Sequence, residues 1–226
     1  MRQTFQAVRH AYRSEGLPSV LRKALVGIPA RLVRWSRKDE LLLEKDLTET
    51  RGLSFDFKLT LRPLEPRDRP LIESFHRKHR VDRDQEARIA WYFDRGYNGF
   101  VAFQSDKPIG YLWWVSNRWS PSENHPHLKT YGIPLGSDDV YAVDFYIAPP
   151  YRGGSNALEF FARAQESLHE AGYRRAFGLV ATYKTPARWT YAALGWKTVR
   201  PMVGYTIFSI LGILNGRMFL AKGRMY

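Results

Sequence analysis

The stretch FYIAPPYRGGSNALEFF, residues 145–161, decides the fold of this chain. Its apolar start has the pattern of a strand that breaks at Pro149 and Pro150, and after Arg152 and two glycines the spacing becomes helical. A helix N-terminus has unpaired backbone N–H groups and a partial positive charge, so it can bind phosphate where glycines let the ligand approach. Gly153 and Gly154 therefore predict either a phosphate site or ordinary turn chemistry, and this stretch alone supports both.

On both sides of residues 145–161, hydrophobic periodicity predicts further elements: a β-meander first, and then alternating strands and helices. The expected elements are a strand at 55–64, helices at 69–79 and 83–96, a hairpin at 99–115 that turns at 105–108, a loop at 117–137, a strand at 139–147, a helix at 155–172, a strand at 174–181, a helix at 185–195 and a terminal hairpin that turns at Asn215-Gly216. This order predicts an α/β protein with a mixed, mostly antiparallel central sheet and helices on both faces.

The basic charge of the chain is concentrated at its N-terminus. Lys and Arg number 35 against 22 Asp and Glu, a formal charge of +13, which predicts an anionic partner. Residues 1–38 hold nine of these cations and one acid, Glu15, and segments 3–12 and 18–35 have helical spacing. We therefore expect residues 1–50 to form a basic amphipathic helical extension and residues 51–226 to form the main domain.

Two interpretations of residues 1–38 remain open. Arginine on one helix face and leucine or valine on the other favour binding to an anionic membrane surface, but the same pattern describes a helix docked on its own domain. Nucleic acid is the weaker expectation, because no nucleic-acid-binding motif accompanies the charge. The chain has no cysteine, which excludes disulfides, thiolate zinc sites and cysteine nucleophiles and fits the cytoplasm, with attachment to the inner face of the membrane.

Neither a membrane-spanning helix nor a metal site is expected. The longest uncharged segment, 201–216, is shorter than the roughly 20 apolar residues that a spanning helix needs, and we expect it to be sheet. His125 and His127 lie in a proline-rich segment without a further Cys or His cluster. We therefore expect an exposed loop there and assign no metal.

Two motifs in the second half of the chain resemble those of the GNAT superfamily, the acyl-CoA-dependent N-acyltransferases. In the first motif, Ile147 and Pro149 end a strand, and Arg152 and Ala157 follow at the matching positions, with Ser155 in place of a glycine. The second motif, KTPARWTYAALGW at 184–196, supplies Ala187, Tyr191, Gly195 and Trp196, with Lys184 in place of an asparagine. The resemblance covers roughly residues 55–226.

The resemblance implies a GNAT fold and a site for acetyl-CoA or another acyl-CoA. Backbone N–H groups at the glycine-rich turn would hold the pyrophosphate beside Arg152, and backbone near Ile147 would bond the pantetheine arm, which Lys184 would approach. Tyr191 would give a proton to the departing thiolate; a tyrosine packed in the core is the alternative. The implied cofactor-binding residues are Ile147, Arg152, Gly153, Gly154, Ser155, Asn156, Ala157 and Lys184.

The acids of the predicted strand at 139–147 are the candidates for a base. Strict alternation places Asp144 on one face with Val140 and Ala142, and a carboxylate midway along a covered strand is costly unless it is paired or functional. Asp144 is therefore predicted to be a base or a ligand for the substrate amine, with a buried ion pair to an arginine as the alternative. Asp138 and Asp139 are expected to be solvated loop acids, and direct attack by the amine without a protein base also stays open.

Two classes of function follow. The first is an N-acyltransferase that moves acetyl from acetyl-CoA to a primary amine of a small molecule or of a sugar or envelope precursor, with an acceptor site built from loops at 76–97 and 117–137. The aromatic residues at 91–93 and 113–114 either line that site or pack in the core. The second is a catalytically inactive binding module at an anionic membrane or nucleic acid, which the departures at Ser155 and Lys184 keep open.

Overall fold

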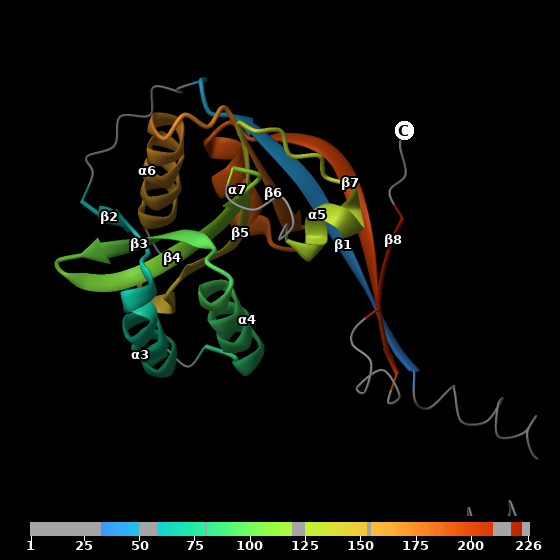
Figure 1. Cartoon of the computed structure of the whole chain (residues 1–226), viewed down its shortest axis with the longest axis horizontal. Coiled ribbons are helices and arrows are strands. Elements are labelled where there is room, and N and C mark those ends of the chain that lie inside the picture. Colours follow the sequence, from blue (N-terminus) through green and yellow to red (C-terminus); the bar gives the residue numbers. More distant parts are fainter. Residues whose placement is uncertain are drawn as a thin grey trace, which may run out of the picture. The chain divides into compact units, whose positions relative to one another are not determined.

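The computed structural model describes residues 33–49, 58–79, 81–118, 125–152, 155–209 and 218–222. In this part of the chain, strands form one sheet in the order β2-β3-β4-β5-β6-β1-β7-β8 (Figure 1). β5 and β6 pair in parallel, whereas β1·β6, β2·β3, β3·β4 and β4·β5 pair antiparallel, which confirms the predicted mixed, mostly antiparallel sheet. The strands are β1 (Val33–Asp46), β2 (Thr60–Pro63), β3 (Asn98–Gln104), β4 (Lys107–Ser116), β5 (Asp139–Ile147), β6 (Arg175–Ala181), β7 (Lys197–Ser209) and β8 (Met218–Lys222).

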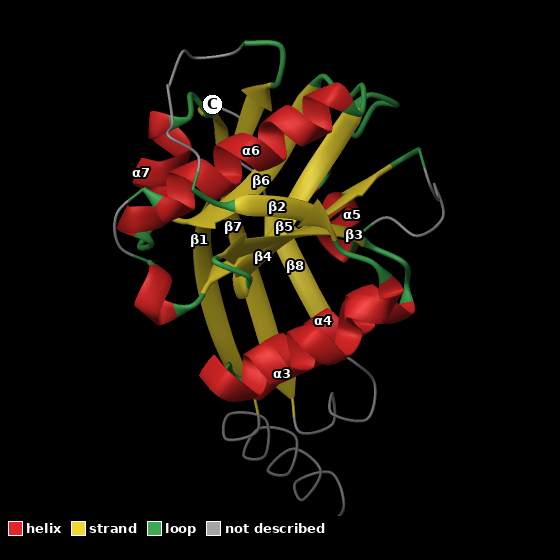
Figure 2. Ribbon diagram, turned by 90° about the vertical axis from the view of Figure 1, so that its left-hand side faces the viewer, coloured by secondary structure: helices red, strands yellow, loops and turns green. Residues whose placement is uncertain are grey.

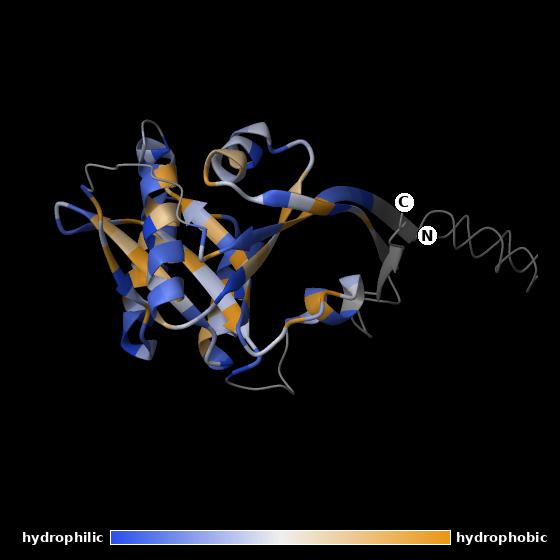
Figure 3. Cartoon of the chain, turned by 90° about the horizontal axis from the view of Figure 1, so that it is seen from above, coloured by the Kyte–Doolittle hydropathy of each residue, from blue (hydrophilic) through white to orange (hydrophobic). Residues whose placement is uncertain are grey.

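Helices cover both faces of the sheet, as predicted (Figure 2). Trp113 of β4 packs on Phe93, whereas its neighbour Trp114 contacts Tyr173 and joins the cluster under α6 and α7, because adjacent strand residues point to opposite faces. Figure 3 shows hydrophobic residues along the central strands and a mixture of hydrophobic and hydrophilic residues on the outer helices. The helices are α3 (Arg69–His79), α4 (Arg83–Asp94), α5 (Pro126–Tyr131), α6 (Asn156–Glu170) and α7 (Thr185–Ala193), with short 3-10 turns at Pro66–Asp68 and Pro149–Tyr151.

The chain divides into two compact units, and residues 39–46, which the prediction assigned to the helical extension, are a strand in the larger unit. One unit holds Asp39–Met202, and the other holds residues up to Lys38 together with Val203–Ala221. Residues 40–46 pair with β6, and Leu42 and Leu43 are buried, because an uninterrupted apolar run gains more from sheet pairing than from a helical extension. The expected helix at 3–12, residues 18–32 of the expected helix at 18–35, and the turn at Asn215-Gly216 lie outside the described residues. Residues 33–35 are the start of β1, so the prediction of helix is wrong for them.

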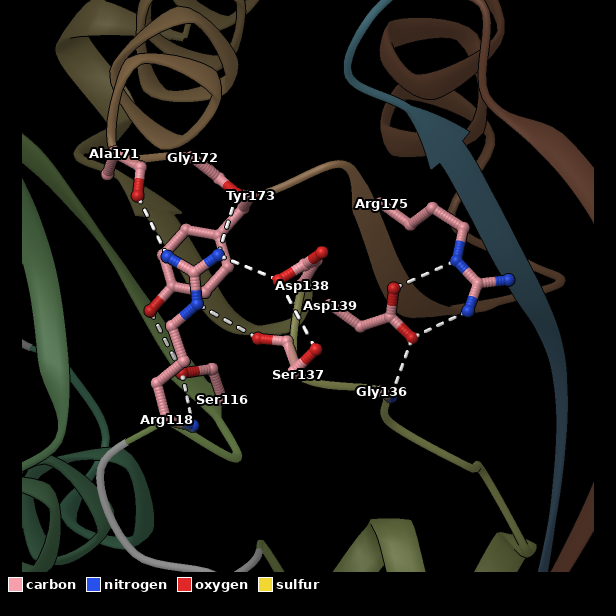
Figure 4. A network of polar contacts seen from close by, with 10 residues as sticks. All are labelled: Ser116, Arg118, Gly136, Ser137, Asp138, Asp139, Ala171, Gly172, Tyr173 and Arg175. Atoms are coloured by element: carbon pink, nitrogen blue, oxygen red, sulfur yellow. Dashed lines mark hydrogen bonds and ion pairs between the residues drawn. The ribbon is translucent and has the colours of Figure 1, made fainter.

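The beginning of β5 is held by a polar network (Figure 4). The guanidinium of Arg118 donates to the carbonyl oxygens of Ser137, Ala171 and Gly172 at 2.7–2.9 Å and to Asp138 at 3.0 Å. Arg175 binds Asp139 through two hydrogen bonds of 2.7 and 2.8 Å. Asp139 is 2 % exposed, so the expectation of a solvated acid is wrong for this residue; its charge is neutralised by an arginine on the next strand.

Within the described part of the chain, no helix is both long enough and apolar enough to cross a membrane.

Candidate active site

The two parallel strands at the centre of the sheet part from each other. Pairing between β5 and β6 runs from Asp139↔Arg175 to Ala142↔Gly178, and none is formed between residues 143–147 and 179–181, all of which the structure describes. The cause is a bulge at Asp144, whose φ is 32°, and the β4–β5 register shifts at the same point. A bulge bends its strand away from a straight ladder, so the edge of β5 toward β6 is open from residue 143 onward.

The bulge also changes the face on which Asp144 lies. Phe145 packs on Phe160 and Phe161 of α6, whereas Asp144 turns to α4 on the opposite face of the sheet. Strict alternation had grouped Asp144 with Ala142, which belongs to the cluster under α6, so that prediction is wrong. The extra residue of a bulge reverses the alternation after it, which no periodicity in the sequence records.

Asp144 forms an ion pair in the structure, the alternative that sequence analysis left open. Arg88 donates to both carboxylate oxygens at 3.0 and 3.2 Å, and the Tyr92 hydroxyl donates at 2.7 Å. Burial alone would raise the pKa of Asp144, but the hydrogen bonds and charge of Arg88, with the Tyr92 hydroxyl, hold it below its usual range. A carboxylate with a lowered pKa is a weak base, so the geometry argues against Asp144 as the general base.

The sequence did not identify Arg88 as a site residue, and Tyr92 was expected only as one of the aromatic residues at 91–93 that line the acceptor site or pack in the core. They stand four positions apart on α4, so they share one helix face, and that spacing was the available signal. The 56 residues that separate Arg88 from Asp144 explain why the pair itself could not be assigned.

The turn after β5 keeps its own side chains away from the helix N-terminus. Ser155 is the N-cap of α6 and makes no side-chain capping bond, and the Asn156 amide donates to the Tyr151 carbonyl at 3.0 Å instead. Nε of Arg152 donates to the Ile147 carbonyl at 2.8 Å, which fixes the guanidinium beside the turn. Gly153 and Gly154 lie outside the described residues. The described part of this turn therefore fits an anion held by backbone N–H groups and Arg152.

Ala157 and Lys184 are the two other residues that were predicted to contact the acyl-CoA. Ala157 packs against the core cluster, so only its backbone can face a ligand. Lys184 is the exposed N-cap of α7, and its side chain makes no capping bond. Lys184 follows the turn at Thr182 and Tyr183 after β6, the strand that has parted from β5.

Tyr191 lies next to the point where β5 and β6 separate. A methyl group built on Gly178, the last paired residue of β6, would lie 3.4 Å from the Tyr191 hydroxyl oxygen. The ring packs edge-on against Phe161 and Trp196, and burial raises the pKa of the hydroxyl above its usual range. A phenol held in this way stays protonated and can donate to a group that becomes anionic.

The histidines of the 117–137 segment are not in an exposed loop, contrary to expectation. His125 is 6 % exposed and is the N-cap of α5, where its Nδ1 accepts from the His127 N–H at 3.1 Å. Burial lowers the pKa of His125 to about 3, so the ring is neutral. Among the described residues, no group of three His, Cys, Asp or Glu could hold a metal ion.

Comparison with known proteins gives structural relatives only. No protein-family model matches the sequence, and no curated protein matches it. Among solved structures, the chain is similar to a GCN5-related glucosamine N-acetyltransferase region of a fungal multi-domain β-N-acetylglucosaminidase, with a TM-score of 0.58 and 17% identity. That match covers 80% of this chain and 22% of the fungal chain, so this chain spans about a fifth of the length of that relative.

Two bacterial proteins have the same architecture. A putative GNAT-family acetyltransferase from Novosphingobium aromaticivorans matches with a TM-score of 0.51 and 13% identity over 78% of this chain and 67% of its own. A GNAT-family acetyltransferase from Colwellia psychrerythraea matches with a TM-score of 0.53 and 10% identity over 78% of this chain and 57% of its own. The chain therefore has the fold of the GCN5-related N-acetyltransferases.

Proposed function

We propose that this protein is an N-acyltransferase that moves an acetyl group from acetyl-CoA to a primary amine. The observation that carries the proposal is the end of β5–β6 pairing at Ala142↔Gly178, directly beside the hydroxyl of Tyr191. An extended thioester arm can bond to the open edge of β5, and the uncapped start of α6 with Arg152 suits a pyrophosphate. In this proposal the start of α6 holds the pyrophosphate, the edge of β5 bonds the thioester arm and Tyr191 gives the proton.

The chemistry requires few protein groups. The amine nitrogen bonds to the thioester carbon, the carbon–sulfur bond breaks, and the sulfur takes the proton of Tyr191. A backbone N–H on the open edge of β5 would stabilise the oxyanion that forms in between. Because the pKa of Asp144 is lowered by Arg88, we infer that the amine arrives unprotonated and gives one proton to solvent as the amide forms. Tyr191 then regains from solvent the proton that it gave to the sulfur.

The acceptor is proposed to approach from the face that carries α4. On that face Asp144, at the bulge, accepts hydrogen bonds from Arg88 and Tyr92. The proposed acceptor is a small amine or an amino sugar of an envelope precursor, which these polar side chains would bind. The name of the fungal relative includes glucosamine, so glucosamine is the first acceptor to test.

The basic residues 1–38 are proposed to attach the enzyme to an anionic membrane, on the strength of their nine Lys and Arg against one acid. Replacing Arg2, Arg9 and Arg13 by glutamine in the full chain should then weaken sedimentation with vesicles that contain phosphatidylglycerol. Unchanged sedimentation would remove this part of the proposal.

The test of the enzyme proposal combines calorimetry with acetyl-CoA and release of free thiol from acetyl-CoA in the presence of glucosamine and a panel of other primary amines. Binding of acetyl-CoA with amine-dependent thiol release is the expected result. Tight binding to anionic vesicles or DNA without any binding of acetyl-CoA would favour the inactive binding module and overturn the enzyme proposal.

A further inference from the structure

The large hydrophobic side chains that are exposed in the described residues gather after β6. They are Tyr183, 77 % exposed, Trp189, 73 % exposed, and Val199, 48 % exposed. Single exposed hydrophobic residues are common on protein surfaces. Two nearly bare aromatic residues within seven positions are not explained by core packing, and the proposed chemistry does not use them.

Trp189 lies on the outer face of α7, and Tyr183 lies in the turn just before that helix. Tyr191 and Leu194 are buried, whereas Arg188, Trp189 and Ala192 are exposed and share one side of the helix by their spacing. Nη1 of Arg188 donates to the Thr182 carbonyl at 3.2 Å, which brings its guanidinium back to the residue beside Tyr183. We call this surface the α7 face; it consists of Tyr183, Lys184, Arg188, Trp189 and Ala192.

The α7 face lies in a part of the chain that carries no negative side chain. Residues 171–226 contain no Asp or Glu and hold nine Lys and Arg. Strand β1 and the turn after it bring acids to this region. Glu40 lies opposite Ala181, and the Asp39 carbonyl accepts from the N–H and the hydroxyl of Thr182. Glu44 and Glu49 pair with Arg175 and Lys197, which are not on the α7 face. Lys184 and Arg188 on the face itself are both exposed. The partner that this charge favours is anionic.

We propose that the α7 face docks on the surface of an anionic lipid bilayer. Tyrosine and tryptophan rings settle at the headgroup level of a bilayer, where one end of the ring is apolar and the other is wet. Lysine and arginine beside them attract anionic headgroups. The exposed side of a helix presents these groups on a convex surface, which suits a bilayer better than a single nucleic-acid strand bound in a groove.

Docking of the α7 face does not require the basic residues 1–38, and its consequence for catalysis rests on the proposed function. It concerns residues on the same helix as Tyr191, and docking there would bring the parted strands close to the bilayer surface. An amine held at the bilayer surface would then lie close to the proposed active site.

The absence of cysteine from the chain allows a local test. An Ala192→Cys variant carries an environment-sensitive fluorophore on the α7 face and keeps Trp189 and Arg188. A Lys107→Cys variant, labelled in the same way on the exposed β3–β4 turn, is the matched control. Both are mixed with vesicles of phosphatidylcholine alone and of phosphatidylcholine with phosphatidylglycerol.

The label at residue 192 should shift to the blue with the anionic vesicles and not with the neutral ones, while the label at residue 107 should not respond. In the Ala192→Cys background, Arg188→Gln should weaken vesicle binding about fivefold, and Arg83→Gln on the exposed start of α4 should leave it unchanged. Equal responses at 192 and 107, or no response at 192, would overturn the proposal. A stronger shift with single-stranded RNA, or a shift that rises with protein concentration without vesicles, would also overturn it in favour of a nucleic acid or a second copy.

Discussion

The two ends of β5 differ in how they are held. At its start, Asp139 is buried against Arg175, and Arg118 joins three carbonyl groups and Asp138, so the strand is fixed on both sides (Figure 4). At its end, the strand bulges at Asp144 and leaves β6 after Ala142↔Gly178. The comparison shows that one strand can combine a rigid scaffold with an open edge, because a single bulge separates the two.

The largest expected effect comes from a substitution at the start of β5, where the strand is fixed on both sides. Asp139→Ala should lower the free energy of unfolding by about 3 kcal/mol, because it removes a buried carboxylate that binds Arg175 and the Gly136 N–H. Denaturant unfolding measures the loss. The matched control is Asp138→Ala, whose side chain is 48% exposed, and this change should cost less than about 1 kcal/mol. Equal losses in the two variants would show that burial at the start of β5 does not matter.

The next largest effect is expected at the end of β5, where the strand has parted from β6. Tyr191→Phe should lower turnover about a hundredfold, because the leaving sulfur loses its proton donor, and should leave the affinity for acetyl-CoA nearly unchanged. Steady-state rates and calorimetry measure the two quantities. A variant with unchanged turnover would identify Tyr191 as a packing residue and move the proton donor elsewhere.

A pH effect follows from the burial of His125. The unfolded chain binds a proton near the ordinary pKa of 6.5, whereas the folded chain holds the pKa at about 3, so stability falls as the pH drops below 6.5. The loss from this group should be about 2 kcal/mol over the first two pH units below that point. His125→Asn keeps an acceptor for the His127 N–H and removes the titration. Identical pH profiles of unfolding for the two proteins would contradict the buried, neutral ring.

The smallest expected effect comes from a substitution at Gly178, where the pairing of β5 with β6 ends. Gly178→Ala adds a methyl group in ordinary contact with Tyr191 and Trp196, at 3.4 and 3.6 Å, so stability should change little. The methyl group would lie beside the Tyr191 hydroxyl, at the last paired residue of β6, and turnover should fall about tenfold. Thermal unfolding and thiol release measure the two effects. Full activity would place the reaction away from Gly178.

Much of this fold could be predicted from sequence, because local patterns determine most of its elements. The strand at Asp139–Ile147 and the helices at Asn156–Glu170 and Thr185–Ala193 follow from periodicity and breakers, and the two motifs placed Tyr191 on the second helix. Contacts between residues far apart in the sequence could not be predicted from periodicity or from helix breakers. The bulge at Asp144, the ion pair of Arg88 and the burial of Asp139 by Arg175 depend on which strands and helices become neighbours.

β1 shows the same limit. Its apolar residues 41–43 lie outside the span of the two motifs and next to a strongly basic segment, so the sequence predicts them as part of the extension. Only the pairing with β6 shows that they belong to the sheet.

The most direct test of the account is amide hydrogen exchange along β5 with and without acetyl-CoA. In the free protein, amides of residues 143–147 that point toward β6 should exchange faster than those of residues 139–142, because pairing with β6 ends at Ala142. Acetyl-CoA should slow exchange at 143–147 and at the start of α6 and leave 139–142 unchanged. Protection that is uniform along β5 in the free protein, or no change at 143–147 when acetyl-CoA binds, would contradict the open strand edge on which the proposed function rests.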